Sequence, residues 1–130
     1  MLDSDNERPV SEIMSRYVLT IDQSSTVQEA VYEMNVLNVG SILIVGPHKQ
    51  LLGIFSERDL LVRVVGKDKD PKKTIISDVM TRNIKTVNMH DSINKVFASL
   101  FMSNFRHFPV VDNSGNLAGI VSVKDFKNKT

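Results

Sequence analysis

Apolar and polar positions follow one pattern that occurs twice along the chain. Each copy begins with a short amphipathic turn, at residues 10–14 and 76–80, and continues into an extended segment at 18–21 and 84–87. An apolar stripe at helical spacing comes next, and polar first-turn residues at 24–26 and 91–92 precede it, which predicts a helix in each copy. The stripes are Val27, Ala30, Val31, Met34 and Leu37 in the first copy and Ile93, Val96, Phe97 and Leu100 in the second.

Two strands are predicted after each of these helices. The continuous apolar runs 42–45 and 108–111 are typical of strands that are covered on both faces. Turns with breaker residues follow, and second strands are expected at 51–56 and 117–122. A final helix is expected from Glu57 and, in the second copy, from near Val123, where the sequence ends. Each copy is therefore a mixed α/β repeat.

The two copies align without a gap. A shift of 66 positions places residues 10–61 on residues 76–127. One such repeat would bury too little apolar surface to be stable alone, so we expect the two to pack face to face around one core. This predicts repeats at 8–66 and 76–130 and a linker at 67–75, whose alternating charges indicate a solvated loop.

Composition narrows the range of functions. Hydrophobic residues make up 42% of the chain and charged residues 24%, as in ordinary globular proteins. A net charge of +1 gives no strong field for nucleic acid or an anionic membrane. The absence of cysteine excludes disulfides and thiolate metal sites. Residues 1–8 do not resemble a signal peptide, and the longest apolar run, 42–45, cannot span a bilayer, so we expect a cytoplasmic protein that binds neither nucleic acid nor membrane.

The sequence carries no constellation that indicates catalysis. We find no nucleophile beside a base, no paired carboxylates and no metal triad, so no enzyme is expected. His48 and His90 lack a second ligand at metal spacing and are expected to be solvated. Core packing is expected for Phe97, Phe101, Phe105 and Phe108, and a core or interface position for Met34, Met89 and Met102.

The pattern Gly-apolar-apolar-Ser-x-x-Asp occurs at 53–59 and again at 119–125. A strand that ends in Ser and continues into a helix places N–H groups and a hydroxyl at a helix N-terminus, where phosphate is favoured. The Asp can accept hydrogen bonds from the two vicinal hydroxyls of a ribose. Alternatively, Ser56 and Ser122 are N-caps, and Asp59 and Asp125 complete capping boxes. The two roles can coexist at one residue.

These motifs resemble the cystathionine β-synthase (CBS) domain family. Met14 and Thr20, their partners Met80 and Thr86, and the strand at 108–112 extend the resemblance over about residues 8–128, as a tandem pair called a Bateman module. It implies two pseudo-symmetric β-α-β-β-α repeats packed sheet to sheet, with two clefts between them. It also implies a regulatory module for energy sensing that binds AMP, ADP, ATP, NAD or S-adenosylmethionine, forms a homodimer and signals to an effector protein.

The resemblance also implies particular contacts. Asp59 and Asp125 would hold the ribose, Ser56 and Ser122 would lie near the phosphate, and Thr20 and Thr86 would contact ribose or base. Similar domains often place a phosphate contact at the position of Arg106 and His107, although a solvent-facing Arg106 is the alternative. Phe108 and Pro109, which begin the strand that follows, are also candidate ligand-binding residues.

The first copy differs at the same place. It has Gly40 and Ser41, which leave space, and it carries Arg58, which could reach a phosphate or form a helix ion pair instead. We therefore expect unequal affinities at the two clefts. A ligand-free interaction or dimerisation module is the competing function, because the helix at 59–65 is expected to expose an apolar surface suited to a two-fold contact. That surface comprises Leu60, Leu61, Val64 and Val65.

Overall fold

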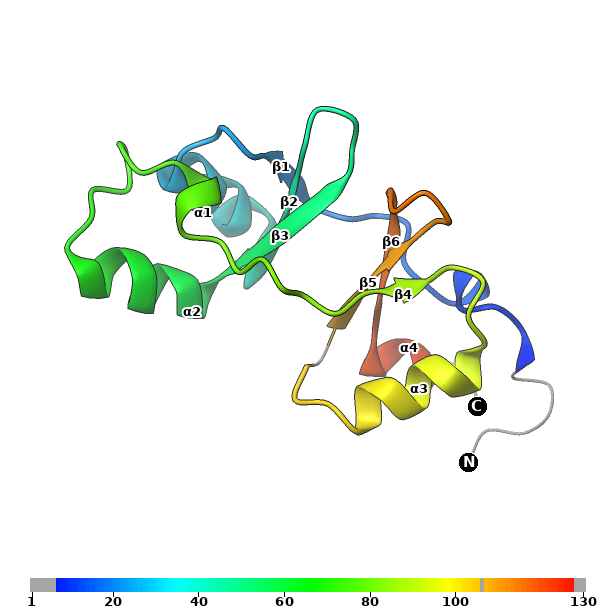
Figure 1. Cartoon of the computed structure of the whole chain (residues 1–130). Helices are drawn as coiled ribbons and strands as arrows, with labels where there is room; N and C mark the ends of the chain where they lie inside the picture. Colours follow the sequence, from blue (N-terminus) through cyan, green and yellow to red (C-terminus); the bar gives the residue numbers. More distant parts are fainter. Residues whose placement is uncertain (1–6, 106, 128–130) are drawn as a thin grey trace. The chain divides into compact units, whose positions relative to one another are not determined.

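The computed structural model describes residues 7–105 and 107–127, and the chain divides into two compact units (Figure 1). The continuous unit is Leu19–Ile84. The split unit combines Met1–Val18 with Lys85–Thr130. Each contains one three-stranded sheet, β1-β2-β3 in the continuous unit and β4-β5-β6 in the split unit, which confirms the predicted mixed α and β fold of two similar repeats. No helix among the described residues is long and apolar enough to cross a bilayer.

In the continuous unit, β1 (Thr20–Asp22) pairs in parallel with β2 (Ser41–Val45), and β2 pairs antiparallel with β3 (Leu51–Ser56). Helix α1 (Val27–Leu37) connects β1 to β2 and buries Val27, Ala30 and Met34 of the predicted stripe. Val31 is half-buried, and Leu37, at the helix end, is 41% exposed. The core contains Val27, Ala30 and Met34 of α1 together with Ile42, Ile44 and Phe55 of the sheet.

A continuous helical run follows β3. It comprises α2 (Glu57–Asp59), the π-helical η3 (Leu60–Val64) and the 3₁₀ segment η4 (Val65–Lys67). Leu61 and Val65 are 65% and 61% exposed, as predicted. The same prediction is wrong for Val64, which is fully buried, and for Leu60, which packs against the core. Residues four apart share a helix face, so the pair at 60 and 64 faces the core and the pair at 61 and 65 faces outward.

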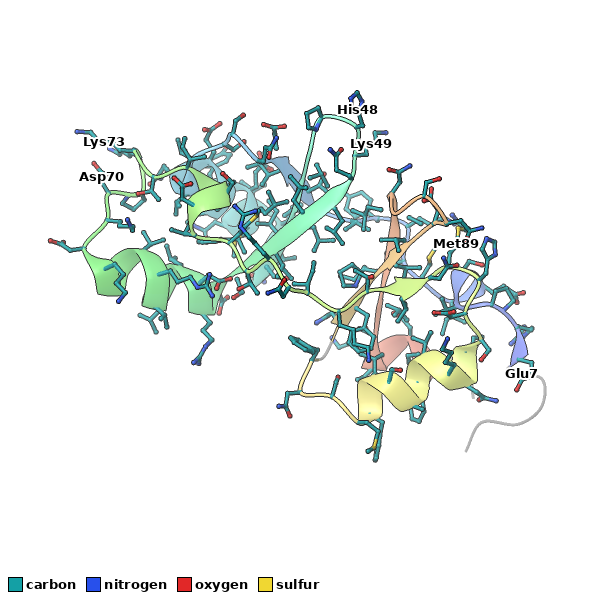
Figure 2. All side chains as sticks on the ribbon, in the orientation of Figure 1. Glu7, His48, Lys49, Asp70, Lys73 and Met89 are labelled. Carbon is teal, nitrogen blue, oxygen red and sulfur yellow. The ribbon has the colours of Figure 1, made fainter. Side chains whose placement is uncertain are left out.

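The charged side chains of the linker after η4 are exposed to solvent, whereas two of its backbone carbonyls form hydrogen bonds with α1. Figure 2 shows Asp70 and Lys73 at the outer edge of the continuous unit, and both are exposed as predicted. The backbone carbonyls of Thr74 and Pro71, however, accept hydrogen bonds from the N–H groups of Val27 and Gln28, each at 2.9 Å. The linker therefore satisfies donors in the first turn of α1 that have no partner within the helix.

In the split unit, β4 (Val87–Asn88) is parallel to β5 (His107–Val111), and β5 is antiparallel to β6 (Leu117–Ser122). Helix α3 (Ile93–Phe101) and helix α4 (Val123–Lys127) lie side by side, with the rings of Phe97 and Phe126 5.1 Å apart. The prediction of core packing is wrong for Phe101 and Phe105, which are 76% and 53% exposed. Phe101 is off the buried stripe of α3, and Phe105 lies beyond its end.

Strand β4 begins later than its counterpart β1 for a local reason. In the continuous unit the N–H of Leu43 donates to the carbonyl of Leu19 at 3.1 Å. Pro109 aligns with Leu43 and has no N–H, so this hydrogen bond has no equivalent in the split unit. The extended segment predicted at 84–87 is accordingly a strand only from Val87.

The first helical turn of each sequence repeat belongs to the compact unit that holds the other repeat's strands. The 3₁₀ helix η2 (Val10–Glu12) precedes β1 in sequence, but Val10 and Met14 lie in the core of the split unit. Its counterpart η5 (Ile76–Asp78) lies in the core of the continuous unit. The sequence repeats and the compact units therefore have different boundaries.

Residues 10–15 and 76–81 are called the exchanged segments, because each packs on the sheet of the other repeat. The glycine of each Gly-apolar-apolar-Ser motif lies where an exchanged segment crosses the sheet. Thr81 forms a backbone bridge with Ile54, and a Cβ on Gly53 would lie 2.6 Å from the Thr81 carbonyl oxygen. In the split unit, a Cβ on Gly119 would lie 2.6 Å from the Ser15 carbonyl oxygen. Both contacts are too close for any side chain, so the packing of the exchanged segments requires these glycines.

Candidate functional site

Each Ser-x-x-Asp motif forms a junction between a strand end and a helix start. Residues 56–59, with the facing start of β2, are called the first junction, and residues 122–125, with the start of β5, the second junction. In the first, the Ser56 N–H donates to Asp59 Oδ2 at 2.9 Å and the Asp59 N–H donates to Ser56 Oγ at 3.3 Å. In the second, the Ser122 N–H donates to Asp125 Oδ2 at 2.7 Å. The capping interpretation is therefore correct as local geometry at the first junction, and the second junction reproduces the bond from Ser122 N–H.

The carboxylate of Asp59 is held by further partners. Its Oδ1 accepts a hydrogen bond from the Thr81 hydroxyl at 3.0 Å and lies 3.5 Å from Arg63 Nε. The Ser56 hydroxyl also donates to Oδ2, at 3.1 Å. Asp59 is 6% exposed and is the one buried charged residue in the described part of the chain. These partners explain how a carboxylate is tolerated at this depth.

The carboxylate of Asp125 has fewer hydrogen-bond partners among the described residues than that of Asp59. Its Oδ2 is bonded to Ser122, whereas its Oδ1 has no hydrogen bond to any residue that the structure describes. Ser15 aligns with Thr81, but its hydroxyl donates to the Tyr17 carbonyl at 3.3 Å. The residue aligned with Arg63 is Lys129, which lies outside the described residues. The two junctions therefore share a backbone geometry and differ in what surrounds the carboxylate.

One cationic side chain precedes the aspartate at each junction. Arg58 is exposed and makes no ion pair within the described residues, because Arg63 takes the position beside Asp59 instead. The helix ion pair considered for Arg58 is thus absent from the described part of the chain. Lys124 aligns with Arg58 and is also exposed. The sequence reasoning missed Lys124, although the 66-residue shift would have identified it.

The space beside Gly40 is not empty. The side chain of Glu57 fills it, since its Oε1 would lie 3.2 Å from a Cβ at Gly40, and the Glu57 N–H donates to the Gly40 carbonyl at 3.0 Å. The flexible Glu57 side chain therefore lies in the space that is expected beside Gly40. Ser41 is half-buried opposite Ser56 in the sheet. A carboxylate at this place repels phosphate, and the second junction has the uncharged Val123 there.

Thr20 lies in a separate groove of the continuous unit. The groove has a volume of about 650 Å³ and is lined by Thr20 and Ser25 and by residues of α1 that include Glu29, Tyr32 and Glu33. None of its lining residues is a lysine or arginine, so the groove offers no cation to a phosphate. At the end of β1, the Ser24 hydroxyl and N–H donate to Asp22 and lower the pKa of its carboxyl.

The remaining predicted residues belong to the split unit. Thr86 is exposed just before β4, and His107 is exposed at the start of β5, opposite Ser122. The ring of Phe108 is 1% exposed within the core, and Pro109 is also buried, so neither side chain faces solvent. Lys85 Nζ lies 5.8 Å from the centroid of the Phe108 ring. Arg106 lies outside the described residues.

Metal-binding groups do not gather at either junction. His48 and His90 are both exposed, as predicted. Over residues 7–105 and 107–127, no group of three or more His, Asp or Glu side chains is placed to hold a metal ion.

The repeated geometry corresponds to a known family. The CBS domain model matches residues 10–66 and again residues 76–129. The chain belongs to the CBS domain family. An uncharacterized protein of Methanopyrus kandleri is 34% identical over 116 residues, which are 89% of this chain and 59% of that protein. A 17.7 kDa protein of Acidianus ambivalens is 29% identical over 89% of this chain and 69% of its own length. The CBS pair thus spans about three fifths to two thirds of these relatives.

Solved structures share the fold. A conserved CBS domain protein of Thermoplasma acidophilum has a TM-score of 0.79 at 27% identity, covering 94% of this chain and 68% of that one. CBSX2, in complex with AMP, has a TM-score of 0.80 at 21% identity, covering 94% and 95%. Hypoxic Response Protein I, with two coordinated zinc ions, has a TM-score of 0.82 at 21% identity, covering 94% and 98%. This chain therefore contains two CBS domains in tandem.

Proposed function

We propose that this CBS pair is a non-catalytic regulatory module that binds an adenine nucleotide or a related adenosyl ligand at its strand–helix junctions and signals to a partner protein. AMP, ADP, ATP, NAD and S-adenosylmethionine are the candidate ligands. The AMP complex of CBSX2, which has the same fold, supports this class of ligand.

The observation that carries the proposal is the second junction. Asp125 is oriented through Oδ2 by the Ser122 N–H, while Oδ1 has no partner among the described residues. Lys124 precedes it and is exposed. A carboxylate that can accept from a diol and a lysine that can pair with a phosphate thus occupy consecutive positions at the start of α4, and a nucleotide carries both groups.

The first junction repeats this chemistry with a different balance of charge. Arg58 supplies the cation, but Glu57 adds a carboxylate beside Gly40 that phosphate would have to avoid or displace. We therefore propose that the two junctions bind the ligand with unequal affinity, the second more tightly.

Isothermal titration calorimetry of nucleotide-free protein tests the proposal. AMP, ADP, ATP, NAD, S-adenosylmethionine and GTP are titrated into wild type, Asp125→Asn and Lys124→Gln, with Lys72→Gln on the exposed linker as the charge-matched control. We expect at least one adenine ligand to bind, GTP not to bind, and the affinity to fall about tenfold or more in Asp125→Asn. Lys72→Gln should bind as wild type does.

Two results would contradict the proposal. Absence of heat with every adenosyl ligand would reject the sensor function, and release of ADP from ATP over time would reject the non-catalytic role. The first result would favour a second candidate, a ligand-free dimerisation module. The exposed apolar side chains of Leu61, Val65 and Phe101 support this alternative.

A further inference from the structure

The two aligned aspartates differ in how much of their carboxylate is available to a ligand. An ionised carboxylate has about four acceptor positions. Asp59 accepts hydrogen bonds from the Ser56 N–H and hydroxyl and from the Thr81 hydroxyl, at 2.9, 3.1 and 3.0 Å, and forms an ion pair with Arg63 at 3.5 Å. Three acceptor positions are hydrogen-bonded and Oδ1 also faces the Arg63 guanidinium, so the two vicinal hydroxyls of a ribose cannot both be accepted unless a partner is displaced.

We propose that Thr81 and Arg63 act as built-in competitors of the ribose at Asp59, so that a nucleotide binds the first junction only by displacing them. This inference rests on the proposed function. It adds two residues, neither of them in the Ser-x-x-Asp motif, that set the affinity of the first junction.

The Thr81 hydroxyl is chemically equivalent to the group that it excludes. It donates to Asp59 Oδ1 at 3.0 Å, as a ribose hydroxyl would. Because it belongs to the same chain, it competes at a high effective concentration that a free ligand has to exceed. The Asp59 side chain is 8% exposed, so the ligand has to move Thr81 and cannot approach beside it.

Displacing Thr81 also disturbs the exchanged segment. The backbone of Thr81 is bonded in both directions to Ile54, from the Thr81 N–H at 2.8 Å and from the Ile54 N–H at 2.9 Å. Arg63 Nη1 donates to the carbonyl of the adjacent Met80 at 3.0 Å. Residues 80 and 81 are thus held to β3 and to the helical run, and binding at Asp59 should loosen the bridge between Ile54 and Thr81.

The second junction supplies a natural comparison. Ser15 occupies the position of Thr81 in the repeat, but its hydroxyl donates to the Tyr17 carbonyl. Among the described residues, Asp125 Oδ1 therefore has no equivalent competitor. A hydroxyl can be removed at position 15 as a matched control for its removal at position 81.

The test measures the first junction alone. In an Asp125→Asn background, nucleotide-free full-length chain is titrated with AMP and, separately, with S-adenosylmethionine, with and without Thr81→Val. Valine keeps the shape of threonine and lacks the hydroxyl. We expect Thr81→Val to raise the affinity about tenfold or more, because a hydrogen bond to a charged group no longer has to be broken. Thr81→Ser should remain weak, and Ser15→Ala in the wild-type background should leave affinity unchanged.

Three further measurements accompany the titration. Circular dichroism melting shows whether Thr81→Val is folded, and Arg63→Gln, which removes the other competitor, should tighten binding in the same direction. Hydrogen exchange of the Thr81 amide in Asp125→Asn should lose protection when AMP saturates the protein.

The outcomes separate this inference from the proposed function. If wild type binds a probe but neither Thr81→Val nor Arg63→Gln tightens the first junction, the inference is wrong and the sensor function stands. If Asp125→Asn binds as tightly as wild type, the first junction is not restrained and the inference is again wrong. If wild type and Thr81→Val bind neither probe, and also none of ADP, ATP and NAD, the two proposals fail together.

Discussion

The glycines at 53 and 119 belong to the Gly-apolar-apolar-Ser-x-x-Asp motifs in the sequence, and in the structure they pack against the exchanged segments. Sulfur atoms of Met80 and Met14 lie 2.8 and 2.7 Å from the positions where a Cβ would be, in addition to the backbone oxygens of Thr81 and Ser15. A methyl group at either glycine would therefore displace an exchanged segment that is fixed to the sheet by two backbone hydrogen bonds.

We expect Gly53→Ala and Gly119→Ala each to lower the free energy of unfolding by about 1–3 kcal/mol, the usual cost of overpacking. Urea unfolding followed by circular dichroism measures this. Gly40→Ala is the control, because the nearest atom there is the end of the flexible Glu57 side chain, at 3.2 Å. Equal stability of all three variants would show that the exchanged segments can shift to accommodate a methyl group at little cost in free energy.

At the residue scale, the sequence predicted which side chains form the junctions but not what they contact. The pairing of Ser56 with Asp59 follows from their spacing, which is the spacing of a capping box. The pairing of Asp59 with Thr81 spans 22 positions and depends on tertiary structure. The side chain of Glu57 beside Gly40 was missed for the same reason, since a sequence gives no direction for an exposed carboxylate.

At the element scale, the strands with the clearest signals were predicted with their observed bounds. β3 and β6 match the expected 51–56 and 117–122, because an apolar run ends at a Ser that starts the next helix. The start of β4 was predicted too early, because a proline in the neighbouring strand removes a ladder donor. The exchange of η2 and η5 was not predicted, because both repeats have the same periodicity and periodicity does not identify the sheet on which a turn packs.

Because these segments are exchanged, a mutation in the segment of one repeat is expected to destabilise the sheet of the other repeat. Met14→Ala and Met80→Ala, at positions 8% and 3% exposed, should each cost about 2–5 kcal/mol of unfolding free energy. In hydrogen exchange, Met14→Ala should reduce protection most in β5 and β6, although it lies near β1 in sequence. Met80→Ala should affect β2 and β3. Met102→Ala, 83% exposed, is the control and should change little. Loss of protection first in β2 and β3 with Met14→Ala would contradict the exchange.

At the scale of the whole molecule, the exposed apolar side chains bear on association. Leu61 and Val65 lie on one face of the helical run after β3, at 65% and 61% exposure. Of the four apolar residues that were predicted to be exposed on this run, only these two are exposed. Val62, at 48% exposure, is a third exposed apolar residue that was not predicted.

We expect the protein to sediment as a dimer and the double variant Leu61→Glu with Val65→Glu to shift toward monomer, because two carboxylates would have to be desolvated in the contact. Lys67→Glu, an exposed change of charge on η4, should sediment as wild type does. Sedimentation velocity over a range of concentrations measures this. A wild type that remains monomeric throughout would exclude self-association through this face.

The exchanged helical turns hold the N-terminal and C-terminal parts of the chain together. A protease that cuts the exposed linker at residues 67–73 would produce an N-terminal fragment that carries η2 with β1–β3 and a C-terminal fragment that carries η5 with β4–β6. Each compact unit then contains pieces of both fragments, since Val10 and Met14 fill one core and Ile76 and Met80 fill the other. The nicked molecule would keep both fragments bound without a covalent link, and neither half could leave without opening both cores.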